Sequence, residues 1–425
     1  MRSSWVGAAA LLALGSAGAL EAQSTAIAIR GGMVHPVSGA PIRNGTVVIQ
    51  NGKITAVGAN VSIPRGATVV DASGKHVIPG VIDAMTNIGI NPGDLNDDVN
   101  PILPGQRIIE SYYPYGEFGQ GKLGELRNEE ALSGGVTTIY IAPADATLIG
   151  GQGAVVKTAG ANIDAVVVRE PAAMDMTLGT PPKAAARSRT RDPYTRMAEM
   201  AQLRQALIKA QEYARTKADK PESPQDLNLE ALGRLLRREI PARIQATSAT
   251  DIRSALRLSQ EFGFDLVIDG GNSATEFIAE LTARRIPVVL GPVSHPYISN
   301  EEIPDKQDYP PLDERTPAKL TDAGVVTAIA TFSRAFGSLA PAGTGKWLLI
   351  DAAIAKGYGM SDEAVLKAVT LIPAQILGVA DRLGSLEVGK DADVVIMDGP
   401  PLSVKSWVER VYVGGEEVFT RSAPR

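Results

Sequence analysis

The chain has 425 residues, enough for one large α/β barrel with a smaller appended domain, or for two to three average domains. Its 42 basic and 47 acidic residues give a net charge of −5 without any run of five like charges, which argues against nucleic acid as a partner. Cysteine is absent, which excludes disulfides, zinc–thiolate sites and thiol nucleophiles, and only three histidines are present.

The first 22 residues are typical of a secretory signal peptide. Arg2 precedes an uncharged apolar run at 5–14, and small residues follow at 16–19, so we expect cleavage after Ala19 or Ala22. The apolar run is shorter than the ~20 residues that a membrane-spanning helix needs, which favours export over anchoring. The sequence therefore predicts an exported protein, periplasmic or extracellular, that has no membrane span after cleavage.

Both ends of the mature chain carry short β-like runs. Between residues 26 and 76 these runs are separated by turn signals such as Asn44-Gly45 and Asn51-Gly52. Short β-like runs occur again at 393–397, 408–413 and 416–419. A closed middle domain, whose own ends lie close together, would let the two terminal parts form one β domain.

The middle of the chain, residues 77–378, alternates apolar runs with helical patterns. Several runs are almost entirely Val and Ile, as in strands buried on both faces, and their alternation with helices predicts a parallel sheet. Eight such units over ~300 residues match a TIM barrel, with long loops at 171–194 and 300–317 over one end. The eight expected strands lie at 81–86, 136–142, 154–158, 165–169, 243–247, 266–269, 287–290 and 325–331.

Ordered motifs bracket this middle segment. Residues 77–83 read VIPGVID and residues 383–395 read LGSLEVGKDADVV, with further matches at 132–138, 149–157 and 373–378. Together they resemble the amidohydrolase superfamily, specifically its imidazolonepropionase-like and prolidase-like branch, over nearly the whole mature chain. The resemblance implies a metal-bearing α/β fold that hydrolyses cyclic amides, amidines or dipeptides. It divides the chain into a (β/α)8 TIM barrel at 77–378 and a composite β-sandwich formed by 23–76 and 379–425, after a signal peptide at 1–22.

The metal-ligand positions of this family are substituted in the chain. In the family a His-x-His pair follows the aspartate that aligns with Asp83, and the period of two along a strand points both imidazoles to the barrel mouth. Further ligands come from the fifth, sixth and eighth strands. A thioether is a poor zinc ligand and a neutral amide is a weak one. The aligned positions hold Met85, Asn87, Gln245, Thr247, Gly270 and Phe332.

Without a bound ion, water at neutral pH is too weak a nucleophile for this hydrolysis, and no serine nucleophile elbow replaces it. We therefore expect a non-catalytic protein, a pseudoenzyme without a cofactor or any assigned catalytic residue. Its mouth would bind a small-molecule ligand or an intact amidohydrolase subunit, and family analogy implies an oligomer. The alternative is an active hydrolase of carbon–nitrogen bonds that holds zinc or another divalent metal through unconventional ligands such as Asp269, Lys157 or His295.

Four residues are candidate pocket contacts: Lys157, Gln152, Asp269 and His295. Lys157 aligns with the lysine that some family members carbamylate to bridge two metals. Gln152 lies in the segment Gly150–Gly153, which either approaches a ligand with bare backbone or only turns tightly before a strand. His295 follows the seventh strand, where it either overhangs the mouth or is a surface residue.

The other polar clusters have simpler interpretations. His35 and His76 lie away from the expected mouth and are interpreted as structural. An acidic segment lacks the spacing of a calcium loop and is interpreted as a solvated turn. An arginine-rich segment at 183–196 either clamps an anion or forms a solvated loop. The residues concerned are Asp94, Asp97 and Asp98 in the acidic segment, and Arg187, Arg189, Arg191 and Arg196 in the basic one.

Overall fold

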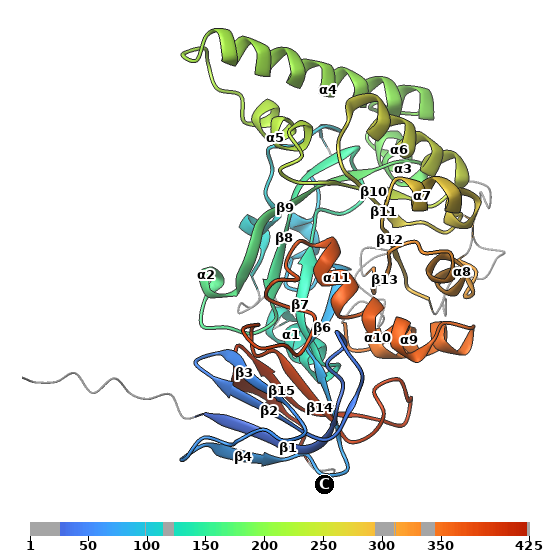
Figure 1. Cartoon of the computed structure of the whole chain (residues 1–425). Coiled ribbons are helices and arrows are strands. Elements are labelled where there is room, and N and C mark those ends of the chain that lie inside the picture. Colours follow the sequence, from blue (N-terminus) through green and yellow to red (C-terminus); the bar gives the residue numbers. More distant parts are fainter. Residues whose placement is uncertain are drawn as a thin grey trace, which may run out of the picture.

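The structure of the chain is a computed structural model that describes residues 26–97, 99–113, 123–293, 310, 312–332 and 345–422. Its strands form two eight-stranded sheets, one built from both ends of the chain and one that curves into a barrel. Figure 1 shows the terminal sheet at one end of the barrel and helix α4 (Arg196–Asp219) at the opposite end. The expected α/β class, with a barrel and a second sheet made by both chain ends, is confirmed.

In the terminal sheet, antiparallel pairing of β5 with β14 joins the two ends of the chain. The turn between β2 and β3 has φ angles of 52° at Asn51 and 73° at Gly52, as a type I′ hairpin requires. The strand order is β16-β15-β14-β5-β1-β2-β3, with β4 beside β1. The bounds are β1 (Ile27–Val34), β2 (Ile42–Gln50), β3 (Lys53–Gly58), β4 (Thr68–Asp71), β5 (His76–Pro79), β14 (Val394–Met397), β15 (Val408–Val413) and β16 (Glu416–Thr420).

The barrel sheet has the order β13-β12-β11-β10-β9-β8-β7-β6 and is nearly closed. Across the remaining seam the backbone N–H of Phe332 donates to the carbonyl of Met85 at 3.1 Å. The backbone N–H and hydroxyl of Thr331 donate to Asp83, whose pKa is raised to about 6 by burial. The bounds are β6 (Val81–Thr86), β7 (Val136–Ile141), β8 (Ile149–Lys157), β9 (Val167–Thr177), β10 (Ala242–Ala246), β11 (Leu266–Gly270), β12 (Val288–Leu290) and β13 (Thr327–Ile329).

The expectation of an all-parallel barrel is wrong for its third strand. β8 pairs antiparallel with both β7 and β9, while the other barrel pairs are parallel. Antiparallel neighbours can be joined by short connections, whereas a parallel pair needs a long crossover. Only residues 142–148 and 158–166 separate these strands, and the latter include the single turn α2 (Ile163–Val166). β8 therefore begins at the mouth and ends at the terminal sheet.

The expected loop at 171–194 is also partly wrong. β9 continues to Thr177, and α3 covers Thr180–Ser188 with proline in its first turn, where a helix tolerates it. Much of the expected loop at 300–317 lies outside the described residues. The remaining helices are α1 (Leu123–Ser133), α5 (Leu227–Leu236), α6 (Ala249–Phe262), α7 (Ile278–Ala283), α8 (Thr316–Asp322), α9 (Leu348–Gly357), α10 (Asp362–Ala368) and α11 (Leu371–Ile376), with 3-10 turns η1 (Pro92–Asp94), η2 (Ile108–Ser111) and η3 (Ala274–Phe277).

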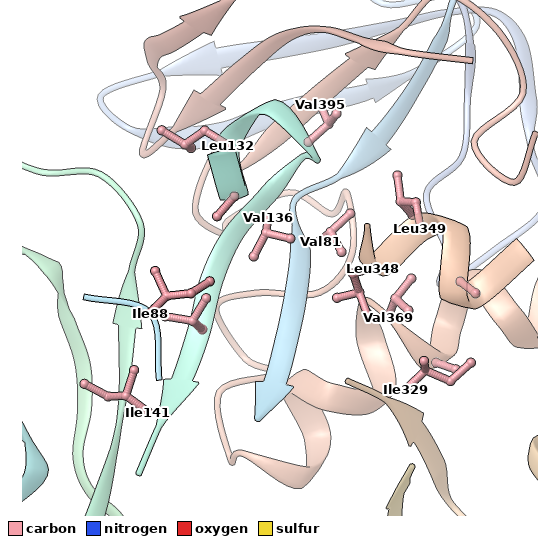
Figure 2. Close-up of a cluster of buried hydrophobic side chains, with 14 of the residues drawn as sticks. Val81, Ile88, Leu132, Val136, Ile141, Ile329, Leu348, Leu349, Val369 and Val395 are labelled. Atoms are coloured by element: carbon pink, nitrogen blue, oxygen red, sulfur yellow. The ribbon is translucent and has the colours of Figure 1, made fainter. Parts of the chain in front are cut away.

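The barrel and the terminal sheet share one hydrophobic core. Figure 2 shows Val81 of β6 and Val136 of β7 in the same buried cluster as Val395 of β14 and Leu348 of α9. All four side chains are fully buried. Burial of apolar surface from both sheets ties them together and places the barrel mouth at the free end. None of the described helices is both long enough and apolar enough to cross a membrane.

Candidate functional site

The six positions predicted to replace metal ligands lie at or just after the carboxyl ends of their strands. Met85 and Gln245 belong to β6 and β10, and Gly270 ends β11. Each of the five with a side chain is at most 8% exposed. Four of the six positions lie close together in two pairs: the backbone N–H of Phe332 donates to the carbonyl of Met85, and a Cβ atom on Gly270 would lie 3.0 Å from the Thr247 methyl. Gln245 donates to Asp145 at 3.4 Å, and Asn87 lies just beyond β6.

Two of these positions are filled by apolar packing. The side chains of Met85 and Phe332 belong to one buried cluster with Ala84, Ala328 and Ala330. Phe332 has a φ of 46°, in the left-handed region that aromatic residues rarely adopt, where the chain leaves the barrel. The seam between the first and last barrel strands is therefore hydrophobic at the level where the family resemblance implies metal ligands.

A polar network occupies the barrel interior beneath these positions. Arg243 of β10 binds Asp269 of β11 side-on, from Nε to Oδ2 at 3.0 Å and from Nη2 to Oδ1 at 2.7 Å. Its guanidinium carbon lies 4.1 Å from the ring centroid of Tyr140, and the hydroxyl of Tyr140 donates to Asp175 Oδ2 at 2.6 Å. All four side chains are at most 3% exposed. The four residues form a continuous chain of contacts across the barrel, called the core network below.

The charge state of the core network follows from its burial. Burial by itself would lower the pKa of Arg243, but the combined effect of Asp269, Tyr140 and Asp175 raises that pKa. Burial, together with the neighbouring Asp175 carboxylate, raises the pKa of Tyr140 well above its usual value. Arg243 is therefore charged, and Tyr140 is a neutral hydrogen-bond donor. Nη1 of Arg243 has no acceptor within the described part of the chain.

Sequence reasoning missed Arg243, Tyr140 and Asp175. The available signal was a charge flanked by apolar residues in a strand: Arg243 lies between Ala242 and Ile244 in β10, and Asp175 lies between Met174 and Met176 in β9. A charged residue in a strand buried on both faces needs a partner. The sequence could have flagged these residues, although it could not have paired them.

The structure separates the candidate pocket contacts from one another. Lys157 ends the antiparallel strand β8 and lies away from the mouth, with Nζ 2.5 Å from Asp393 Oδ2 and 3.5 Å from Asp391 Oδ2. Its expected position at the mouth is wrong because β8 runs opposite to its neighbours. Asp269 is bound by Arg243. His295 lies outside the described residues.

Gln152 and its neighbouring glycines pack against other parts of the protein and do not border an open pocket. Gln152 Nε2 donates to the carbonyl of Pro104 at 3.1 Å, which secures the segment after β6 against β8. A Cβ atom on Gly151 would lie 2.6 Å from the carbonyl oxygen of Gln106. A Cβ atom on Gly153 would overlap the hydroxyl of Tyr140. The glycines at 151 and 153 therefore let the backbone of β8 lie close to Gln106 and to Tyr140 of the core network.

Among the other polar candidates, His35 and His76 stack in the terminal sheet, with ring centroids 5.1 Å apart and a 2.8 Å contact from Nε2 to Nδ1. Asp94 and Asp97 line an open cavity of about 460 Å³ beside the segment after β6. Asp98 lies outside the described residues. Neither group adjoins the core network through any described contact.

Arginines of the segment 183–196 form hydrogen bonds and an ion pair with other groups of the protein. Arg187 donates to the carbonyl of Tyr194 at 3.3 Å, and Arg191 donates to that of Ala146 at 3.3 Å. Arg189 is the residue that ends α3. Arg196 pairs with the carboxylate of Asp251 at 2.7 Å. These contacts hold α3 and α4 to the barrel.

A second buried carboxyl group lies beside Asp251. Glu199, in the first turn of α4, is 1% exposed and accepts from the backbone N–H of Gly179 at 3.4 Å through Oε2. Its Oε1 has no partner among the described residues. Burial, and then the negative charge of Asp251, raise the pKa of Glu199 to about 7.

The described residues do not fit the divalent ion that the family resemblance implies. Within the described ranges, no three His, Asp or Glu side chains lie close enough together to hold a metal ion. The carboxylate of Asp269 is already bound on both oxygens by Arg243. Thioether, amide and hydroxyl groups stand at the positions where the family resemblance predicts imidazoles.

Comparison with known proteins gives matches along most of the chain. Residues 306–418 match the amidohydrolase family. The structure resembles that of an amidohydrolase from Thermotoga maritima MSB8, with 35% identity and a TM-score of 0.83, covering 93% of this chain and 100% of that one. A prolidase bound to N-methylphosphonate-L-proline has the same fold, with 18% identity, a TM-score of 0.56 and coverage of 93% and 100%.

A curated relative is larger than this chain. Amidohydrolase tasK of Hapsidospora irregularis is 26% identical over 416 residues, which cover 88% of this chain and 40% of that protein. Imidazolonepropionase of Thermoplasma acidophilum is 26% identical over 162 residues, covering 38% of this chain and 30% of the enzyme. The chain thus spans less than half the length of these curated relatives.

Proposed function

The chain belongs to the amidohydrolase family, and we propose that it is a non-catalytic member whose barrel mouth binds a ligand or a partner protein. The observation that carries this proposal is the packing of Met85 and Phe332 into one buried apolar cluster at the seam of the barrel. Side chains that fill a hydrophobic cluster cannot also coordinate an ion. A fold of this kind keeps its use as a scaffold when its chemistry is lost.

The engagement of two carboxylates inside the barrel supports the same proposal. Asp269 is bound side-on by Arg243, and Asp175 accepts from Tyr140. Neither group is positioned to take a proton from a reacting water while these bonds persist. Arg243 Nη1, a buried donor without an acceptor among the described residues, would suit a ligand that carries a neutral carbonyl oxygen.

The alternative function is hydrolysis of carbon–nitrogen bonds through unconventional metal ligands. Of the three residues considered for it, Asp269 is occupied by Arg243, and Lys157 pairs with Asp393 away from the mouth. The third residue, His295, lies outside the described residues. The experiment below therefore tests His295 directly.

Metal content and hydrolysis decide between the two functions. The mature chain would be produced with added zinc or manganese, its metal measured by mass spectrometry, and hydrolysis of cyclic amides and dipeptides assayed before and after chelation. We expect far less than one ion per chain and no chelator-sensitive hydrolysis. One tightly held ion per chain, with an activity that chelation and His295→Ala both abolish, would establish the alternative instead.

Export, partner and assembly belong to the same proposal. The pattern at 1–22, which is typical of a signal peptide, supports a periplasmic or extracellular location. The expected partner is an intact amidohydrolase subunit, and the expected assembly is an oligomer by analogy with the family. Amino-terminal sequencing of the protein from the periplasm or medium tests export, since an uncleaved chain retained in the cytoplasm would contradict it. Co-purification with a catalytically active subunit tests the partner.

A further inference from the structure

Three charged side chains from three adjacent strands meet inside the barrel. Asp175 comes from β9, Arg243 from β10 and Asp269 from β11, and Tyr140 of β7 connects the first two. In the register of the sheet, Arg243 lies directly opposite Asp175, and Asp269 lies directly opposite Gln245. The core network therefore reaches the level of the mouth positions at Asp269 and lies two residues below it at Arg243 and Asp175, and it spans the wall of the barrel.

Burying these charges has a high desolvation cost, so their arrangement needs a reason. A buried ion pair contributes little net stability, but removing one partner leaves an uncompensated charge in a medium of low dielectric constant. The neighbouring strand accommodates the arrangement, because β8 has glycine at position 153, where any side chain would overlap the hydroxyl of Tyr140. Five consecutive strands, β7 to β11, thus contribute to or make room for one charged centre.

We propose that Arg243 is the fixed cation of this barrel and takes over the electrostatic role that a divalent ion has in metal-bearing relatives. Its guanidinium neutralises carboxylates that converge below the mouth and links β7, β10 and β11. The inference rests on the proposed function, since it assumes that no ion occupies the mouth.

The chemistry of a guanidinium explains how such a barrel stays folded while losing hydrolysis. Arginine keeps its proton in proteins and holds a carboxylate with two parallel hydrogen bonds, so it can join strands as an ion does. It offers only N–H donors and no vacant coordination site for water. It therefore cannot lower the pKa of a bound water toward 7, which is the step that metal hydrolases depend on.

Substitution of Arg243 in the full mature chain tests the role of charge against that of shape. We expect Arg243→Met to lower the melting temperature by several degrees, because Asp269 then lacks its counter-ion. Arg243→Lys, which keeps the charge, should lose less than Arg243→Met. The double variant Arg243→Met/Asp269→Asn should recover much of the loss, because neither charge remains buried. Should Arg243→Met not fold, a folded double variant and a folded Arg243→Lys give the same result.

A matched control is Arg204→Met, because Arg204 forms an ion pair with Glu261 at 2.8 Å in which both side chains are at least 33% exposed. That substitution should leave the melting temperature nearly unchanged. All measurements are made with and without EDTA, and the parent protein should melt at the same temperature in both.

The inference is overturned if Arg243→Lys is as damaging as Arg243→Met, or if the double variant is no better than Arg243→Met. It is also overturned if EDTA alone lowers the melting temperature of the parent protein. Failure of the proposed function has a different signature, namely chelator-sensitive hydrolysis. The two can be told apart because the first is read from stability in metal-free buffer and the second from activity.

Discussion

Replacing Glu199 with glutamine should stabilise the protein at alkaline pH. The carboxyl group of Glu199 is buried at the start of α4, with its Oε1 unpartnered among the described residues and Asp251 nearby. Lys183 and Arg196 favour its ionised form, but burial and Asp251 outweigh them. Glutamine has nearly the same shape and keeps an oxygen for the N–H of Gly179, so the substitution removes the charge and little else.

The size and sign of the effect follow from the pKa of Glu199, which rises from 4.5 to about 7 on folding. A displacement of that size corresponds to about 3 kcal/mol, as an upper limit. Because the folded state binds this proton more tightly than the unfolded chain, the carboxyl group causes no penalty below pH 4.5. The penalty grows as pH rises through this interval and is complete above pH 7.

Urea unfolding of the parent and of Glu199→Gln at pH 4.5, 6 and 8 measures this directly. The variant should match the parent at the lowest pH and exceed its free energy of unfolding by up to about 3 kcal/mol at pH 8. Glu212→Gln, on an exposed position of the same helix, is the control and should show no such divergence. A variant that is less stable than the parent at pH 8 would refute the reasoning, since the ionised carboxylate would then be net favourable.

Two further substitutions test the packing of β8. Gly153→Ala should lower the free energy of unfolding by about 1–3 kcal/mol, because the added methyl overlaps the hydroxyl of Tyr140. Gly39→Ala, where nothing lies within 4 Å of the added carbon, should cost far less, and equal costs would contradict the assigned overlap. Lys157→Met should cost about 3–5 kcal/mol by leaving a buried carboxylate unpaired. Lys53→Met, at a 47% exposed lysine, should cost under about 1 kcal/mol, and denaturant titration ranks the two.

Much of the fold could be predicted from local sequence signals. The turn signal at Asn51-Gly52 marked a hairpin that the structure contains, and apolar runs marked segments that became barrel strands. The direction of β8 could not be predicted in this way, because a buried strand has the same apolar pattern whichever way it runs. Because β8 runs antiparallel to its neighbours, Lys157 lies at the terminal sheet and not at the mouth, where it was expected.

The candidate site was predictable in position but not in its pairing. Met85 and Gln245 were identified by their place in the motifs, and both lie at the carboxyl ends of their strands. Arg243 lay inside an expected strand, yet nothing local to it specified Asp269 as its partner or Tyr140 as the ring beneath it. Periodicity assigns a side chain to a face of a sheet, whereas its partners depend on how neighbouring strands are staggered.

The sequence by itself determined which chemical groups the protein can use: it has no thiol and three histidines. Only the tertiary structure decided which charges meet. Lys157 pairs with a carboxylate 236 residues away, and Arg243 pairs with one 26 residues away. Such contacts form because strand order and direction bring distant segments together, and the energy of a buried charge depends on those neighbours far more than on its own position in the chain.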